Sequence, residues 1–216
     1  MTTSPVSLIW ITPDAESIIT YCARVSNPKG QEANANPERL LNYLVKHKHW
    51  SCFEMTSACF EINTTRDISA QILRHRSFSF QEFSQRYAEV QLRAEIPNLR
   101  RQDLTNRQNS IDDLDPYDSQ GLQTEIARHF VESEKLYQRL LGFGVAKECA
   151  RKVLPMNSPT RLYMSGTIRS WIHYLSVRTG PETQLEHRQI ADEVKGLLIK
   201  QLPGLNSLLS NSDSDD

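Results

Sequence analysis

The sequence predicts the α/β (α+β) class: a single domain with a mostly antiparallel sheet flanked by helices. Two hydrophobic periods support this. Residues 56–65 alternate apolar and polar side chains, as a half-buried strand does, and residues 122–141 repeat apolar side chains every three to four positions, as an amphipathic helix does. The chain has 216 residues, 38% hydrophobic and 24% charged, without internal repeats, which suits one globular domain with a buried core.

The N-terminal half predicts two strands and three helices. Ile68, Ile72 and His75 recur at helical spacing, which places them on one face of the third helix. The expected elements are a strand at 6–11, helices at 14–25 and 37–49, a strand at 56–65 and a helix at 67–75, with a turn-rich loop at 27–37.

The C-terminal half predicts four helices and one more strand. Residues 93–121 are polar and contain proline, so a loop with short helical turns is expected there. The further elements are helices at 122–141 and 145–154, a strand at 160–167, and helices at 169–177 and 182–202. One domain is therefore expected over residues 1–209, followed by a disordered acidic tail at 210–216.

The charge of the chain argues against binding of nucleic acid through a general positive field, because the formal net charge is −1 at pH 7. Arginine is nevertheless concentrated: residues 66–107 contain eight arginines, whereas no lysine occurs between Lys48 and Lys135. Arginine suits planar, bidentate recognition of anions, so the bias indicates an anion site. A solvated arginine-rich surface is the alternative interpretation.

The four cysteines are scattered and show neither C-x-x-C nor metal-ligand spacing. His47 and His49 are two positions apart and would face different sides of a helix, so no metal is expected. The N-terminus lacks the pattern of a signal peptide, and no apolar run approaches the roughly 20 residues that span a bilayer. We therefore expect a cytoplasmic protein with reduced thiols.

Residues 74–87 carry the densest chemistry, reading Arg-His-Arg-Ser-Phe-Ser-Phe-Gln-Glu-Phe-Ser-Gln-Arg-Tyr. Guanidinium groups, hydroxyls and one carboxylate together indicate a pocket for an anionic, ring-bearing ligand such as a nucleotide. Arg74, His75 and Arg76 are adjacent and would point in three directions from a helix end. They can form one site only if the chain turns there, or if more than one ligand or subunit lies against them.

The whole motif resembles the signature of the flavin-dependent thymidylate synthases, RHRxxSxNExSxRY. Gln81 stands where that family usually has asparagine. The matching positions are Arg74, His75, Arg76, Ser79, Glu82, Ser84, Arg86 and Tyr87. Residues 49–54, 150–155 and 167–178 are similar to three further segments of the family, H-x-[ST]-x-F-E, A-R-x-x-L-P and its last ligand-binding helix.

The resemblance implies the flavin-dependent thymidylate synthase fold and the reductive methylation of dUMP to dTMP. Methylenetetrahydrofolate would give the carbon and FAD, reduced by NADPH, the hydride. The resemblance also implies a homotetramer whose sites are shared between subunits. No side chain would attack the pyrimidine, which agrees with the absence of a cysteine in a basic, helix-starting position.

The resemblance also assigns residues. Arg178 would stabilise negative charge on the uracil as the catalytic residue, and His49 would lie near the flavin or the folate. The implied dUMP contacts are Gln71, Arg74, Glu82, Phe83, Ser84, Gln85, Arg86, Arg151 and Arg178. The implied FAD contacts are Ser51, Arg74, His75, Arg76, Glu82, Thr167, Ile168, Arg169 and His173.

Two other functions compete with this interpretation. An arginine-rich nucleic-acid-binding module could stack bases on the aromatic residues of the motif, although near-neutral charge and the lack of a known RNA-binding signature disfavour it. A metal hydrolase built on the histidines lacks any ligand-spaced pair.

Overall fold

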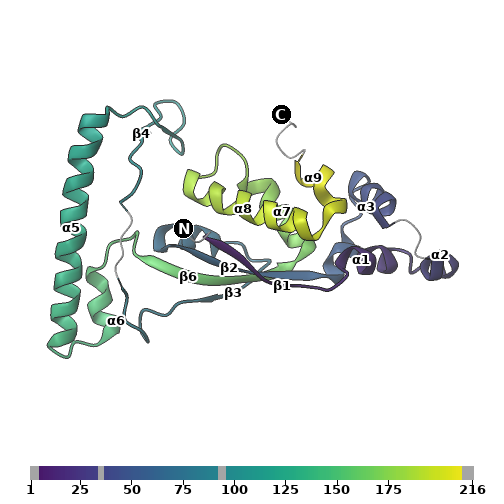
Figure 1. Cartoon of the computed structure of the whole chain (residues 1–216), viewed down its shortest axis with the longest axis horizontal. Helices are drawn as coiled ribbons and strands as arrows, with labels where there is room; N and C mark the ends of the chain where they lie inside the picture. Colours follow the sequence, from purple (N-terminus) through teal and green to yellow (C-terminus); the bar gives the residue numbers. More distant parts are fainter. Residues whose placement is uncertain (1–4, 34–36, 92–95, 211–216) are drawn as a thin grey trace. The chain divides into compact units, whose positions relative to one another are not determined.

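The computed structural model describes residues 5–33, 37–91 and 96–210 (Figure 1). The tail expected at 210–216 lies outside these residues except for Ser210, which ends the last helix. The elements in chain order are β1 (Val6–Ile11), α1 (Ala15–Ala23), α2 (Pro28–Ala33), α3 (Pro37–Lys46), η1 (Ser51–Met55), β2 (Ser57–Thr65), α4 (Arg66–Ile72), β3 (Ser79–Glu82), β4 (Arg101–Gln102), β5 (Ser110–Ile111), α5 (Pro116–Gly142), α6 (Lys147–Ala150), η2 (Arg151–Val153), β6 (Pro159–Thr167), α7 (Ile168–Arg178), α8 (Leu185–Gln201), η3 (Pro203–Leu205) and α9 (Asn206–Ser210).

The described residues form two compact units. Unit 1 takes its residues from 1–62, 73–81 and 163–216, and unit 2 from 63–72 and 82–162. The boundary falls within β2 and β6 and, in the signature motif, between Gln81 and Glu82. Each unit therefore fixes its own part of that motif.

The main sheet has four strands in the order β1-β2-β6-β3. β1 and β2 pair antiparallel, with Val6 opposite Ile62 and a register shift between Leu8 and Trp10. On β2, Phe60 and Ile62 are fully buried, which confirms the strand expected from alternation. The short strands β4 and β5 pair antiparallel as a separate two-stranded sheet. The mixture of helices and antiparallel strands confirms the predicted fold class.

Trp171 on α7 organises the core of unit 1. Its indole Nε1 donates a hydrogen bond to the carbonyl of Ala58 at 3.1 Å. The ring meets Phe60 and Phe78 edge-on, with centroids 4.9 and 4.7 Å away. A Cβ built on Gly166 would lie 2.5 Å from Phe78, so this strand position has room only for glycine. These contacts anchor the first half of the motif.

Helices α7 and α8 lie side by side in unit 1, drawn in yellow-green in Figure 1. Tyr174 and Leu175 of α7 and Val194 and Leu198 of α8 are buried. Both helices follow the predicted apolar periods, so these two predictions are confirmed.

The long helix α5 dominates unit 2 and begins earlier than its apolar period indicates. Asp115 caps it, because its carboxylate accepts hydrogen bonds from the backbone N–H groups of Tyr117 and Asp118, and Pro116 occupies the first turn. Tyr137 of this helix is fully buried and its hydroxyl accepts a hydrogen bond from the backbone N–H of Val90 at 3.3 Å. That bond holds the segment that follows the motif against α5 within unit 2.

Several predicted segments differ from the structure, among them the helix expected at 145–154, which is divided into α6 and the 3-10 helix η2. The loop expected at 27–37 contains helix α2, and the loop expected at 93–121 contains the β4–β5 hairpin and the start of α5. The helix expected at 37–49 stops at Lys46, because Lys48 adopts a left-handed backbone with φ of 55°. Strand β3, within the motif, was not predicted at all.

Candidate functional site

The Arg-His-Arg triplet lies in the turn between α4 and β3. Helix α4 ends at Ile72, three residues earlier than expected, so the triplet lies outside the helix. A turn, one of the two arrangements that the sequence allows for a single site, is therefore present. Arg74 and Arg76 are exposed, whereas His75 is half-buried.

His75 contacts Arg178, the last residue of α7. Arg178 Nε donates a hydrogen bond to His75 Nε2 at 2.9 Å, although the two residues are 103 positions apart in sequence. A guanidinium has no acceptor, so this Nε2 must be unprotonated and the ring neutral. Burial, followed by the electrostatic effects of Arg178 and His173, lowers the pKa of His75 to about 4. At neutral pH the imidazole therefore serves as a fixed acceptor for Arg178.

Tyr174 and His187 lie behind this pair. The Tyr174 ring meets the His75 ring edge-on with centroids 4.9 Å apart, and its hydroxyl shares a hydrogen bond of 3.1 Å with His187 Nε2. Both residues are fully buried. Burial, then the charge of Arg178, lowers the pKa of His187 to about 3, and burial raises the pKa of Tyr174. Arg178 is thus backed by neutral polar groups.

These histidines make the folded protein sensitive to acid. Their folded pKa values, about 4 for His75 and about 3 for His187, lie below the ordinary 6.5. Their contribution to the free energy of unfolding is therefore complete above pH 6.5 and is lost as the pH falls toward those values. We expect that free energy to fall below pH 6.5, by at most about 1.4 kcal/mol per pH unit for each histidine.

Urea unfolding of the wild type and His187→Gln between pH 5 and 8 measures this effect. The variant lacks one of the two groups, so its slope below pH 6.5 should be about half as steep. Equal slopes in the two proteins would contradict the assignment.

Glu82, expected to contact ligands, is held by unit 2. Its Oε1 accepts hydrogen bonds from the hydroxyls of Ser69 at 2.6 Å and Thr160 at 3.0 Å. Its Oε2 pairs with Arg66 at 2.8 Å, and only 16% of the Glu82 side chain is exposed. Both carboxylate oxygens are therefore engaged with α4 and β6, which fixes the end of β3.

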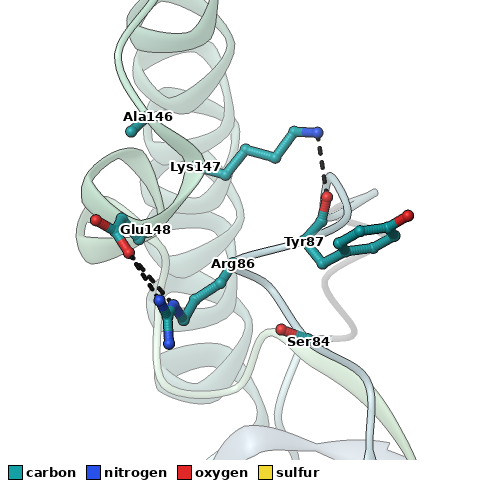
Figure 2. Close-up of a pocket in the computed structure, with 6 residues that line it drawn as sticks. All are labelled: Ser84, Arg86, Tyr87, Ala146, Lys147 and Glu148. Atoms are coloured by element: carbon teal, nitrogen blue, oxygen red, sulfur yellow. Dashed lines mark hydrogen bonds and ion pairs between the residues drawn. The ribbon is translucent and has the colours of Figure 1, made fainter.

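A pocket of about 410 Å³ in unit 2 joins the end of the motif to the start of α6. Figure 2 shows Arg86 directed at Glu148, and the Lys147 ammonium directed at the carbonyl of Tyr87. Arg86 Nη2 lies 3.3 Å from Glu148, and Lys147 Nζ donates to Tyr87 at 3.2 Å. Ser84 contributes its hydroxyl. Two cations against one carboxylate make this pocket suited to an anion.

The other expected dUMP contacts differ in exposure. Phe83 and Arg74 are exposed, and Gln71 and Arg151 are half-buried. Gln85 is buried, and its side-chain Nε2 has no hydrogen-bond partner among the described residues. Arg74 and Arg178 belong to unit 1, and the remaining expected contacts to unit 2.

Several expected FAD contacts lie near the start of α7. Thr167 caps this helix, accepting a hydrogen bond from the backbone N–H of Ser170, and the side chain of Ile168 is buried. Arg169 is exposed and pairs with Glu54. His173 is exposed one turn further along.

The remaining expected FAD contacts precede β2 or flank His75. Ser51 and His49 are exposed, and the His49 ring lies 6.0 Å from that of Tyr43. Among the described residues, no ion pair engages Arg74 or Arg76. Phosphate groups such as those of a flavin dinucleotide accept hydrogen bonds from exposed guanidinium groups, so this residue set fits FAD.

Residues at these sites that were not predicted from the sequence include Tyr174, His187 and Lys147. Tyr174 lies four residues before Arg178, and His187 falls at helical spacing with Ile190 and Val194 on the buried side of α8. Those spacings were the available signals. A lone histidine on an apolar face gives no indication of its partner.

Comparison with known proteins identifies the family. Residues 7–204 match the family model described as "Thymidylate synthase complementing protein". The chain is 48% identical over 195 residues to the probable flavin-dependent thymidylate synthase of Paramecium bursaria Chlorella virus 1, covering 90% of both chains. It is also 48% identical over 194 residues to the flavin-dependent thymidylate synthase of Synechocystis sp., covering 90% of this chain and 89% of the other.

The fold has a solved counterpart. The UMP/dUMP methylase PolB of Streptomyces cacaoi, crystallised with 5-Br dUMP, is 27% identical, with a TM-score of 0.84 over 97% of each chain. The predicted activity, FAD-dependent methylation of dUMP to dTMP, is thereby confirmed at the level of the family. The chain belongs to the flavin-dependent thymidylate synthase family.

Proposed function

We propose that the chain methylates dUMP reductively without an enzyme nucleophile, with Arg178 as its catalytic residue. The observation that carries this proposal is the hydrogen bond from Arg178 to the neutral His75 of the signature motif. An arginine held by an uncharged acceptor keeps its full positive charge for a ligand. Placed against the uracil, that charge would stabilise the negative charge that develops on the ring as C5 becomes nucleophilic.

The dUMP phosphate would bind in the pocket of unit 2. Ser84, Arg86 and Lys147 provide a hydroxyl and two cations there, and Arg151 follows one turn later in η2. Phosphate oxygens would replace the Glu148 carboxylate as the partner of Arg86, because both present a pair of anionic oxygens to the guanidinium. Gln71, Arg74, Glu82, Phe83 and Gln85 complete the proposed dUMP contacts.

Glu148 therefore competes with the substrate for Arg86. The pair is exposed, with 67% of the Arg86 side chain and 54% of the Glu148 side chain accessible, so breaking it costs little stability. We expect Glu148→Gln to lower the KM for dUMP by about twofold to fivefold, since the change removes a carboxylate that repels the phosphate. Steady-state kinetics with Glu193→Gln, on α8, as the control measure this. An unchanged or higher KM in Glu148→Gln would place the phosphate elsewhere.

FAD would be held by Ser51, Arg74, His75, Arg76, Arg169 and His173, with Glu82, Thr167 and Ile168 supporting them and His49 beside the flavin or the folate. When bound and reduced, the flavin supplies the hydride that turns the transferred carbon into a methyl group. Arg74 and Arg76 would neutralise its phosphates, and Arg169 would exchange Glu54 for a phosphate partner.

The proposal also includes NADPH as reductant, methylenetetrahydrofolate as carbon donor and a homotetramer with shared sites. It includes a cytoplasmic location, which suits the free thiols of all four cysteines. Among the described helices, none has the length and apolar character needed to cross a membrane.

Substitution of Cys149 tests the proposal that the enzyme uses no nucleophile. Burial raises the pKa of Cys52 and Cys59, which disfavours the reactive thiolate. Cys149 is different: it is exposed within α6, between Lys147 and Arg151. Cys149 is therefore the cysteine whose substitution best tests the expectation that the enzyme uses no nucleophile. We expect Cys149→Ser to form dTMP within about threefold of the wild-type rate, because the proposed mechanism does not use a thiolate. The test is sharp because a Ser hydroxyl could not replace an essential thiolate. Loss of turnover without unfolding would reveal a covalent mechanism.

Reconstitution with FAD tests the function as a whole. The purified protein should be yellow, release FAD on denaturation and form dTMP from dUMP when methylenetetrahydrofolate and NADPH are supplied. Colourless protein that cannot be reconstituted, together with tight binding of single-stranded RNA, would instead support the nucleic-acid-binding alternative.

A further inference from the structure

We propose that Tyr174 and His187 are positioning residues for the methylation, acting on Arg178 through His75. The inference rests on the proposed role of Arg178. Neither residue is on the surface, and neither belongs to the signature motif, so their effect on the reaction would be transmitted through contacts in the core of unit 1.

The contacts form an unbroken series. His187 Nε2 and the Tyr174 hydroxyl share a hydrogen bond of 3.1 Å, the Tyr174 and His75 ring centroids are 4.9 Å apart at 77°, and His75 Nε2 accepts from Arg178 at 2.9 Å. Tyr174 and Arg178 are also four residues apart on α7, which stacks them on one helix face. The same helix thus presents the arginine and the ring that supports the arginine's acceptor.

The polarity of the buried pair is its informative property. Tyr174 and His187 are both 0% exposed, and packing alone would be served by Phe and Leu, which need no hydrogen-bond partner. A hydrogen bond at the hydroxyl fixes the tilt and depth of the Tyr174 ring. The Tyr174 ring that packs against His75 is then held in one position, and this fixes the direction in which His75 Nε2 faces.

The arrangement determines where the arginine can point. Arg178 is half-buried, and its guanidinium is flat, so one bond at Nε sets the plane of the whole group. If the Tyr174 ring were free to shift, His75 Nε2 would shift with it, and the guanidinium of Arg178 would lose its fixed orientation. Misplacement of a reacting group by about 1 Å can cost roughly 100-fold in rate.

Tyr174→Phe is the mildest test, because it keeps the ring and removes only the hydroxyl. His187→Gln keeps a hydrogen-bonding side chain, and His187→Leu removes it. Thr20→Val is the matched control, since Thr20 is also fully buried in unit 1 and its hydroxyl donates to the carbonyls of Glu16 and Ser17. All variants are assayed as FAD-loaded holoenzyme.

The readout is the ratio of dTMP formed to NADPH oxidised. The assay uses air-saturated buffer, in which dioxygen reoxidises any reduced flavin that does not take part in methylation. NADPH consumption then reports reduction of the flavin and dTMP reports methyl transfer, so a partly unfolded sample lowers both in proportion and leaves the ratio unchanged. We expect Tyr174→Phe and His187→Leu to lower the ratio by about tenfold, His187→Gln less, and Thr20→Val not at all. In an Arg178→Lys background, adding Tyr174→Phe should lower the ratio no further, because residues that act through one group are not additive.

The outcomes separate the two proposals. If Arg178→Ala lowers the ratio but Tyr174→Phe and His187→Gln behave like Thr20→Val, the positioning inference is overturned and the role of Arg178 stands. If Arg178→Ala itself keeps the wild-type ratio, the proposed function of Arg178 fails first. A further loss from Tyr174→Phe in the Arg178→Lys background would also overturn the inference, since the hydroxyl would then act by another route.

Discussion

Arg178→Ala should lower the rate of dTMP formation by about 10²–10³ while leaving the fold intact, the usual cost of removing a group that stabilises developing charge. The structure gives a reason for the size of the effect. The guanidinium is oriented by a bond to a neutral acceptor, His75 Nε2, so in the proposed role its charge would need no reorganisation as the uracil ring becomes anionic. The measurement is single-turnover formation of dTMP from enzyme loaded with FAD and dUMP.

Two further variants define the result. Arg178→Lys keeps a positive charge but lacks the planar fork, so we expect an intermediate rate. Arg139→Ala removes an exposed arginine of α5 that packs over Phe143, and should leave the rate unchanged. Near wild-type turnover in Arg178→Ala would show that another group supplies the charge.

The sequence predicted those elements whose side chains carry a regular apolar period. Phe60 and Ile62 on β2, and Val194 and Leu198 on α8, are buried as their spacing requires. The start of α5 was missed because acidic and proline residues were interpreted as loop, although Asp115 followed by Pro116 is a helix-start signal.

The β4–β5 hairpin had no apolar signal to find. It is held by the side chain of Asp103, which accepts hydrogen bonds from the backbone N–H groups of Thr105 and Asn106 and from the Asn109 amide. These polar contacts lower the pKa of Asp103. Strands of two residues are too short to show alternation, so only turn chemistry could have indicated this structure.

The site was predictable in its residues but not in its contacts. Arg178 and His75 were both named from family resemblance, yet no sequence pattern connects two positions 103 residues apart. Lys147 was missed because a lysine at a helix start has no signature of its own. Its place in the pocket depends on how the chain from Ser84 to Tyr87 packs in unit 2.

The signature motif is divided between two kinds of support. Its first half, with His75 and Phe78, is fixed by aromatic contacts in the core of unit 1. Its second half is fixed by ionic and hydroxyl contacts of Glu82 in unit 2. The motif therefore has an apolar anchor in unit 1 and a polar anchor in unit 2.

Glu82→Ala should destabilise the protein by roughly 2–3 kcal/mol, because it removes two hydroxyl hydrogen bonds and leaves Arg66 without its carboxylate. The value lies below that of a fully buried pair, since 35% of the Arg66 side chain is exposed. Urea unfolding of the wild type and of Glu82→Ala at about pH 7.5 measures the difference. At roughly that pH His75 and His187 are neutral in both the folded and the unfolded state.

Glu148→Ala is the matched control, because Glu148 also pairs with an arginine of unit 2 but is 54% exposed, and its loss should cost less than about 0.5 kcal/mol. The comparison separates two roles for Glu82. If Glu82 is a structural anchor, stability should fall strongly in Glu82→Ala and less in Glu82→Gln. The single amide oxygen of the glutamine can still accept hydrogen bonds from Ser69 and Thr160. A direct ligand contact predicts instead that Glu82→Gln raises the KM for dUMP or releases FAD with stability unchanged. That second pattern would mean the carboxylate leaves Arg66 when ligands bind.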